Sequence, residues 1–219
     1  MAFDRASLEL IPASYFARDP REVAPHLLGC VVATVVDGEF SAGVIVETEA
    51  YLGADDRGSH AATKGVTPRN AVMYGPPGVA YVYFTYGNHY MLNFVCAPKG
   101  TAGAVLVRAL RPVDGVDAMT SRRHGRPLHE LCSGPGKLMA ALGVDLSDNG
   151  SVLGEGRIAV YYGERPPLGE LAVSGRVGLT SGHELELRYY LAHDPFVSRG
   201  RTGPLRSKRR SSASTRRTQ

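Results

Sequence analysis

The pattern of apolar and polar residues predicts a sheet assembled from β-hairpins. A β-branched, apolar run from Cys30 to Val36 precedes Asp37-Gly38, and a second run extends from Glu39 to Tyr51. Asp-Gly between two such runs is one of the strongest short-range hairpin signals. Further strands are expected over Val79–Thr85, Tyr90–Ala97, Ala104–Leu110, Arg157–Tyr162 and Glu184–Leu191.

The predicted helices are few and short. Asp19-Pro20-Arg21-Glu22 is typical of a helix start, with a capping aspartate and a proline at the first position. This helix is expected to end at Gly29, and Pro25 would kink it. Other helices are expected over Val116–Arg123, over Lys137–Leu142 and from Thr67-Pro68 to Met73, whereas Ala54–Gly65 is expected to be a loop. Strands paired by hairpins, together with short helices, indicate an α+β fold with a mainly antiparallel sheet.

The composition is that of a single globular domain. The 219 residues are 43% hydrophobic and 21% charged, which excludes a disordered or collagen-like chain. No apolar stretch approaches the roughly 18 residues of a membrane span. The charged residues Asp4, Arg5 and Glu9 argue against a signal peptide. Three scattered cysteines form no disulfide framework and suit a reducing compartment.

The net charge of +4 is unevenly distributed along the chain. Residues 199–219 hold eight Lys or Arg and no Asp or Glu, which leaves 17 basic and 21 acidic residues before them. We therefore expect a domain over residues 1–203 and a basic, disordered tail over residues 204–219. To bind nucleic acid, the domain would need a local basic face. Candidates for this face are Arg57, Lys64, Arg69, Arg122, Arg123, Arg126 and Lys137.

Two carboxylates and a tyrosine share one face of the strand expected over residues 39–51. Strand alternation places Glu47, Glu49 and Tyr51 together. The commoner explanation for such a face is a solvated sheet edge, and the alternative is a general base beside an aromatic wall. Five of the 11 tyrosines also fall within 17 residues, which indicates either core packing or an aromatic patch that stacks on bases. They are Tyr74, Tyr81, Tyr83, Tyr86 and Tyr90.

Several other catalytic patterns are incomplete. Gly134-Pro135-Gly136-Lys137 lacks the first glycine and the Ser or Thr of a P-loop. Its simpler interpretation is a helix start that could hold a phosphate. The seven histidines show no metal-ligand spacing, so no metal site is expected. The sequence also has no G-x-S-x-G elbow of a serine hydrolase.

Short motifs follow one another in a defined order between residues 8 and 198. They are Glu47–Gly53, His60, Thr67–Asn70, Tyr81–Gly87, Asn93, Arg108–Leu110, Ser133–Leu138 and Pro195–Ser198. Each motif alone is weak evidence, but the ordered set is highly specific. With it, the chain closely resembles the alkyladenine (3-methyladenine) DNA glycosylase family.

The resemblance implies a single mixed α/β domain that pushes a protruding β-hairpin into the DNA minor groove. Tyr86, at the tip of the second hairpin, would fill the gap left by a flipped-out nucleotide. Tyr51, His60 and Tyr83 would sandwich the flipped base. Asn93 would line the pocket floor, where the exocyclic amino group of a normal guanine would collide.

The resemblance also implies a catalytic pair. Glu49 would be the general base that deprotonates a water at C1′ of the sugar, and Arg108 would help to place that water. Strand alternation alone equally allows Glu47 as the base. Arg69 and Lys137 are expected to contact DNA phosphates. No cofactor is implied, and without a well-placed lysine the enzyme is expected to be monofunctional, with no Schiff-base strand cleavage.

The function expected from the sequence is the excision of alkylated, and also deaminated, purines from double-stranded DNA. A monomer that binds no membrane is expected, in the bacterial cytoplasm with the nucleoid or in a eukaryotic nucleus. Two other interpretations are a non-catalytic minor-groove DNA-binding module and a nucleoside hydrolase. Glu49 argues against the first and the exposed Tyr86 argues against the second.

Overall fold

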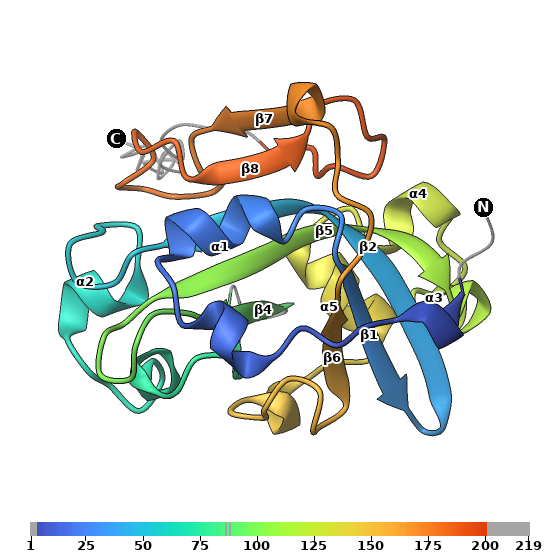
Figure 1. Cartoon of the computed structure of the whole chain (residues 1–219), viewed down its shortest axis with the longest axis horizontal. Coiled ribbons are helices and arrows are strands. Elements are labelled where there is room, and N and C mark those ends of the chain that lie inside the picture. Colours follow the sequence, from blue (N-terminus) through green and yellow to red (C-terminus); the bar gives the residue numbers. More distant parts are fainter. Residues whose placement is uncertain (1–3, 86, 88, 201–219) are drawn as a thin grey trace, which may run out of the picture.

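The computed structural model describes residues 4–85, 87 and 89–200 (Figure 1). Its strands are β1 (Val31–Val36), β2 (Glu39–Tyr51), β3 (Ala80–Thr85), β4 (His89–Val95), β5 (Ala104–Asp114), β6 (Ile158–Tyr161), β7 (Leu171–Ser174) and β8 (Arg188–Leu191). Its α-helices are α1 (Pro20–His26), α2 (His60–Lys64), α3 (Val116–Arg122), α4 (Leu128–Leu131) and α5 (Pro135–Leu142). Short 3-10 helices cover Arg5–Ser7, Ala13–Phe16, Ala71–Tyr74, Leu146–Asp148 and Leu168–Glu170. Tyr86, the side chain of Lys64 and residues 201–219, with the predicted tail, lie outside the described residues.

The strands form one sheet in the order β3-β4-β5-β2-β1-β6, with β8 beside β2 and β7 beside β8. Every pairing among the described strands is antiparallel. The predicted α+β fold with a mainly antiparallel sheet is therefore confirmed. Within the described ranges, no helix combines the length and the apolar character needed to cross a bilayer.

β2 is the central strand of the region that carries the two carboxylates. β1 pairs with residues 39–44 of β2, and β8 pairs with residues 47–49. β5 pairs along the other edge, with register irregularities beside Glu47. Glu47 and Glu49 thus have a strand on each side and are fully buried, so the alternative of a solvated sheet edge is wrong.

Local chemistry explains the first hairpin and the first helix. Asp37 and Gly38 have positive φ angles of 53° and 80°, as the two central residues of a type I′ turn require. The side chain of Asp19 accepts a backbone hydrogen bond and caps α1, as predicted. The helix ends at His26, earlier than predicted and directly after Pro25, which has no N–H to donate.

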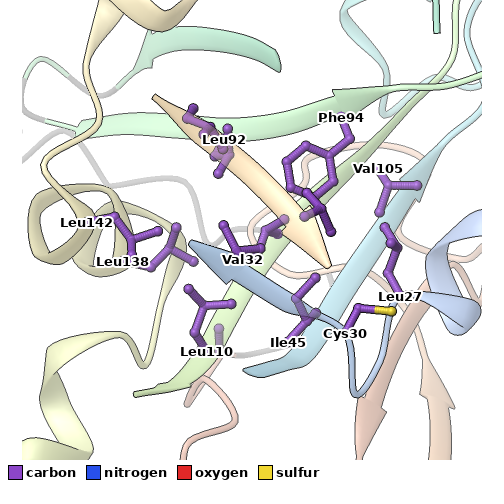
Figure 2. Packing of buried hydrophobic residues seen from close by; sticks show 14 of the residues in the cluster. Leu27, Cys30, Val32, Ile45, Leu92, Phe94, Val105, Leu110, Leu138 and Leu142 are labelled. Atoms are coloured by element: carbon purple, nitrogen blue, oxygen red, sulfur yellow. The ribbon is translucent and has the colours of Figure 1, made fainter. Parts of the chain in front are cut away.

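The hydrophobic core joins the sheet to the helices. In Figure 2, Leu138 and Leu142 of α5 lie near Val32 of β1 and Leu110 of β5, and all four side chains are fully buried. Burial of this kind stabilises a fold by about 1.5–3 kcal/mol for each large aliphatic side chain. α5 is thereby fixed against the sheet, and its first residue, Pro135, reaches the cavity described below.

α1 determines which face of β2 is left for the site. Figure 1 shows α1 lying across β2 and β5, which it contacts. The hydroxyl of Thr48 donates to the carbonyl of Ala24 in α1 at 2.9 Å. Because neighbouring residues of a strand point to opposite faces, Glu47 and Glu49 point away from α1.

Several elements differ from the prediction. Residues 54–65 are not only a loop, because they contain α2, which Ser59 caps by accepting a hydrogen bond from a backbone N–H. The helical turn after Thr67-Pro68 begins at Ala71 and is a 3-10 helix. The last strand begins at Arg188, later than predicted, and its partner β7 and the helix α4 are not predicted by the sequence pattern.

Candidate active site

Glu47 is surrounded by hydrogen-bond donors. The Nε atoms of Arg108 and Arg188 donate to its Oε1 at 2.9 and 2.7 Å. Ser198 donates twice, from Oγ to Oε1 at 2.9 Å and from its backbone N–H to Oε2 at 2.7 Å. These four donors equal in number the roughly four lone pairs of a carboxylate. Three of them converge on Oε1 and the fourth reaches Oε2, and two of the four are charged guanidinium groups, so Glu47 is held by two arginines.

Glu49 is equally buried but has fewer strong partners. The hydroxyl of Tyr51 donates to Oε2 at 2.8 Å, and the backbone N–H of Val177 donates to Oε1 at 2.7 Å. Nη1 of Arg108 lies 3.3 Å from Oε1. From the described residues, Oε2 therefore accepts a single hydrogen bond, and it retains acceptor capacity for a further proton donor.

Arg108 lies between the two carboxylates. Burial alone would lower the pKa of Arg108, but Glu49 and Glu47 raise it above its ordinary value. Burial and the charge of Glu49 also raise the pKa of Tyr51. The guanidinium therefore stays charged, and the phenol keeps the proton that it donates to Glu49.

A cavity of about 290 Å³ lies beside this cluster. This volume is at the lower end of the roughly 300–1,000 Å³ that is common for small-ligand pockets, so an occupant as small as a single base is appropriate. All four residues predicted to bind the base line the cavity, namely Tyr51, His60, Tyr83 and Asn93. Arg108 and Val177 line it as well. Glu49 lies behind the wall, in contact with three of the lining residues.

One side of the cavity is an aromatic cluster. The rings of His60 and Tyr83 meet edge to face with centroids 4.6 Å apart, and those of Tyr81 and Tyr83 are 5.2 Å apart. Nδ1 of His60 lies 3.2 Å from the hydroxyl of Tyr81. Burial, and secondarily the charge of Arg69, lower the pKa of His60. The imidazole is therefore neutral at neutral pH, and this wall is aromatic and uncharged.

Two asparagines fix the walls in place. The side-chain amide of Asn70 donates to the carbonyls of His60 and Gly65, at 3.1 and 2.8 Å, and so holds both ends of α2. The amide of Asn93 donates to the carbonyl of Tyr81 at 3.1 Å across the β3–β4 pairing. Asn70, the last residue of the Thr67–Asn70 motif, thus holds the backbone of His60 in place.

The buried ion pair of Asp56 and Arg176 was not found by sequence reasoning. Both side chains are fully buried, and Nη2 of Arg176 donates to Oδ1 of Asp56 at 2.6 Å. The guanidinium carbon lies 4.6 Å from the ring centroid of Tyr51. Burial opposes the charge of each partner, but the pairing lowers the pKa of Asp56 and raises that of Arg176. The partners lie 120 residues apart, so no local pattern could reveal them.

The predicted basic face is assembled only in part. Arg69 is exposed, with its guanidinium carbon 5.3 Å from the ring centroid of Tyr83. Nζ of Lys137 lies 3.2 Å from the hydroxyl of Ser133, at the start of α5. Arg122 instead pairs with Glu39 at the start of β2, at 3.3 Å. Within the described residues, no group of His, Cys, Asp and Glu side chains is arranged to hold a metal ion.

Comparison with known proteins identifies the family. The family model described as methylpurine-DNA glycosylase (MPG) matches residues 14–195. The chain belongs to this family. A relative from Koribacter versatilis is 45% identical over 206 residues, which cover 88% of this chain and 95% of the relative. A relative from Carboxydothermus hydrogenoformans is 45% identical, with coverage of 87% and 99%, and one from Rhodopseudomonas palustris is 47% identical, with coverage of 89% and 94%. All three are provisionally named 3-methyladenine DNA glycosylase.

Membership of the methylpurine-DNA glycosylase family confirms the resemblance that the ordered motifs indicated. The chain is therefore a DNA glycosylase, a class of base-excision repair enzyme. The match spans every site residue named above except Ser198.

Proposed function

We propose that this methylpurine-DNA glycosylase flips alkylated, and also deaminated, purines out of double-stranded DNA into the 290 Å³ cavity. Tyr51, Tyr83 and His60 would enclose the base, since all three line the cavity. Aromatic faces attract cations, so they favour a base made cationic by alkylation. The neutral imidazole adds no charge that would repel such a base. The exclusion of normal guanine is assigned to Asn93, which is anchored to Tyr81.

In the proposed mechanism Glu49 is the general base. A water attacks C1′, the bond from C1′ to the base nitrogen breaks, and its electron pair leaves with the base. Glu49 accepts the water proton, and its negative charge favours the oxocarbenium character that develops on the sugar. The observation that carries this proposal is that the partners of Glu49, namely Tyr51, Arg108 and Val177, all line the cavity.

Contact with the DNA backbone is assigned to the cavity rim. Pro135, the first residue of α5, lines the base cavity and two neighbouring cavities, and Lys137 lines both of those neighbours. Arg69 is exposed beside Tyr83. We assign phosphate contacts to Arg69 and Lys137, and the intercalating role to Tyr86 on sequence grounds alone. A monomer suffices, because one chain holds the complete set of groups.

The test is a duplex oligonucleotide that carries one hypoxanthine or one ethenoadenine. Incubation with the protein should produce strand cleavage only after alkali treatment, because hydrolysis leaves an abasic site in an intact strand. Binding without base release would instead indicate a non-catalytic minor-groove module. Faster release from the free nucleoside than from the duplex would indicate a nucleoside hydrolase.

A borohydride trap tests the monofunctional mechanism. A water nucleophile forms no imine, so borohydride should capture no covalent complex of protein and DNA. A trapped adduct would contradict the assignment of a water activated by Glu49. The same oligonucleotide serves for both experiments, so that failure to bind cannot be mistaken for failure to trap.

A further inference from the structure

We infer that Glu47 is a positioning residue, which binds Nε of Arg108, limits the contact of that guanidinium with Glu49 to Nη1, and so keeps Glu49 free to accept the proton of water. The inference rests on the proposed function, because it deepens the mechanism of that same site. It assigns different tasks to two carboxylates that the sequence alone cannot distinguish.

The strand register places Arg108 between the two glutamates. In the pairing of β2 with β5, Glu47 lies opposite Ala109 and Glu49 lies opposite Leu106, so Arg108 projects between them. The register shifts on either side of Glu47, and Arg108 has no paired residue on β2. A β-bulge of this kind redirects a side chain beside a functional site.

The contacts of Arg108 are unequal. Its Nε donates to Glu47 at 2.9 Å with hydrogen-bond geometry, whereas its Nη1 lies 3.3 Å from Glu49. Nη2 lies 3.4 Å from the hydroxyl of Ser198, which itself donates to Glu47. Glu47 and Ser198 thus take up two of the three nitrogens, and the guanidinium is turned toward Glu47.

Glu47 is itself held from the opposite side. Arg188 of β8 donates to it at 2.7 Å, and this guanidinium lies over the ring of Tyr190 at 4.3 Å. The side chains of Glu47, Arg108 and Arg188 are at most 8% exposed. Solvent therefore screens these charges weakly, and removing one of them changes the electrostatic interactions of the other two.

The charges around Glu49 indicate what the loss of Glu47 would do. Glu49 faces Arg108, the neutral phenol of Tyr51 and, more distantly, Arg176, whose charge is matched by Asp56. Without the charge of Glu47, Arg108 has only Glu49 as a carboxylate partner. A full ion pair would occupy the oxygens of Glu49 that should receive the water proton.

The first variant is Glu47→Gln, which preserves the shape of the side chain and removes its charge. The single-turnover rate of base release should fall about 10- to 100-fold, the loss expected when a catalytic group is misplaced by about 1 Å. Affinity for the lesion duplex should change little, because Glu47 does not line the base cavity.

A second variant separates positioning from folding, since a buried cation left unpaired destabilises a protein. Glu47→Gln/Arg188→Gln removes one charge of each sign and should recover much of the thermal stability. The single-turnover rate should nevertheless stay lowered, while the affinity for the lesion duplex stays unchanged. The matched control is Asp148→Asn, which disrupts the ion pair of a buried carboxylate with the half-buried Arg157, at 2.7 Å, and neither residue lines the cavity. It should lower stability and leave the single-turnover rate unchanged.

The outcomes distinguish this inference from the proposed function. If the unsubstituted protein releases no base, the proposed function fails. If it is active and the double variant has an unchanged rate, the positioning role of Glu47 is refuted and the proposed function stands. A rate that follows stability alone across all three variants would likewise refute the positioning role.

Discussion

Two glutamates on one face of β2 have different environments because different segments of the chain supply most of their hydrogen-bond donors. Glu47 meets the guanidinium groups of Arg108 and Arg188, whereas Glu49 meets the neutral donors Tyr51 and Val177 and only the outer nitrogen of Arg108. Strong ion pairs stabilise an anion and weaken it as a base. At the scale of single residues, the difference in partners favours Glu49 as the group that activates water.

Glu49→Gln should abolish most of the activity without preventing substrate binding. The amide keeps the size of the side chain but cannot take the proton of water, so we expect a loss of about 10²–10⁴-fold in the single-turnover rate. Binding to a lesion duplex, measured by fluorescence anisotropy, should stay within a few-fold of the unsubstituted protein. An unchanged rate would refute Glu49 as the base.

His60 should make the binding of cationic lesions depend on pH. Burial and Arg69 lower the pKa of His60 below its ordinary value near 6.5, so the ring stays neutral until the pH falls below that value. Protonation then places a positive charge beside a cationic base, and affinity should fall by up to about tenfold per pH unit.

The measurement compares two duplexes with hydrolysis-resistant 2′-fluoro sugars, one with 7-methylguanine and one with ethenoadenine. Only the cationic lesion should lose affinity strongly as the pH is lowered from 7 to below 6.5. His60→Phe keeps an aromatic wall that cannot titrate and should remove this difference. The same pH dependence in His60→Phe would contradict the assignment.

At the scale of elements, local sequence patterns predict where most strands lie, but they do not predict which segments pair with a strand and bury it. The bounds of β2 match the prediction, because alternation and the Asp37-Gly38 turn are local signals. Its burial depends on β5 and β8, which join it from about 60 and 140 residues further along the chain. The helix α2 was missed although Ser59, an N-cap residue before helix-forming residues, was a readable signal.

In the candidate active site too, contacts between distant segments of the chain are not predicted by local patterns. Tyr51, His60, Tyr83, Asn93 and Arg108 were named through the family resemblance, and the structure brings all five to one cavity. Their supporting partners belong to no local motif and arise only when distant segments pack. These partners are Asp56, Arg176 and Arg188.

The ion pair of Asp56 and Arg176 joins two loops that line the cavity. The first loop carries Gly58 and leads into α2, and the second carries Val177, which follows Arg176 directly. Gly58 is required here, because a Cβ atom on it would lie 2.6 Å from Nη2 of Arg176. The pair therefore fixes the distance between His60 on one side and the N–H that contacts Glu49 on the other.

Asp56→Asn should destabilise the protein and loosen the cavity. Leaving a fully buried guanidinium without its counter-ion costs about 3–5 kcal/mol, measurable as a lower urea midpoint of unfolding. Lesion affinity should fall as well, since both loops lose their common anchor. The control is Glu130→Gln, which removes a solvent-accessible pair with Arg126, worth about 0.2–1 kcal/mol. Equal effects of the two substitutions would contradict this role.

At the scale of the whole molecule, the distribution of charge separates binding from chemistry. The segment before position 199 contains 17 basic and 21 acidic residues, whereas the last 21 positions contain eight basic residues and no acidic one. The candidate catalytic and base-binding groups all lie within the described part of the domain, and their charges are largely paired there. The excess of basic over acidic residues, which favours binding to DNA phosphates, is concentrated at the C-terminal end of the sequence.

Deleting residues 204–219 should therefore weaken DNA binding without slowing the chemical step. The deletion removes six Lys or Arg, and each phosphate that is no longer neutralised reduces the slope of log affinity against log salt by about 0.9. Affinity should fall most at low salt, and the salt dependence should become flatter. The single-turnover rate at saturating protein should stay unchanged, because no group of the proposed mechanism is removed.

A full-length variant with these six residues replaced by Gln keeps the length of the chain and should behave like the deletion. A slower chemical step in either variant would show instead that the C-terminal segment acts on the active site, for which Ser198, bound to Glu47, provides a direct route.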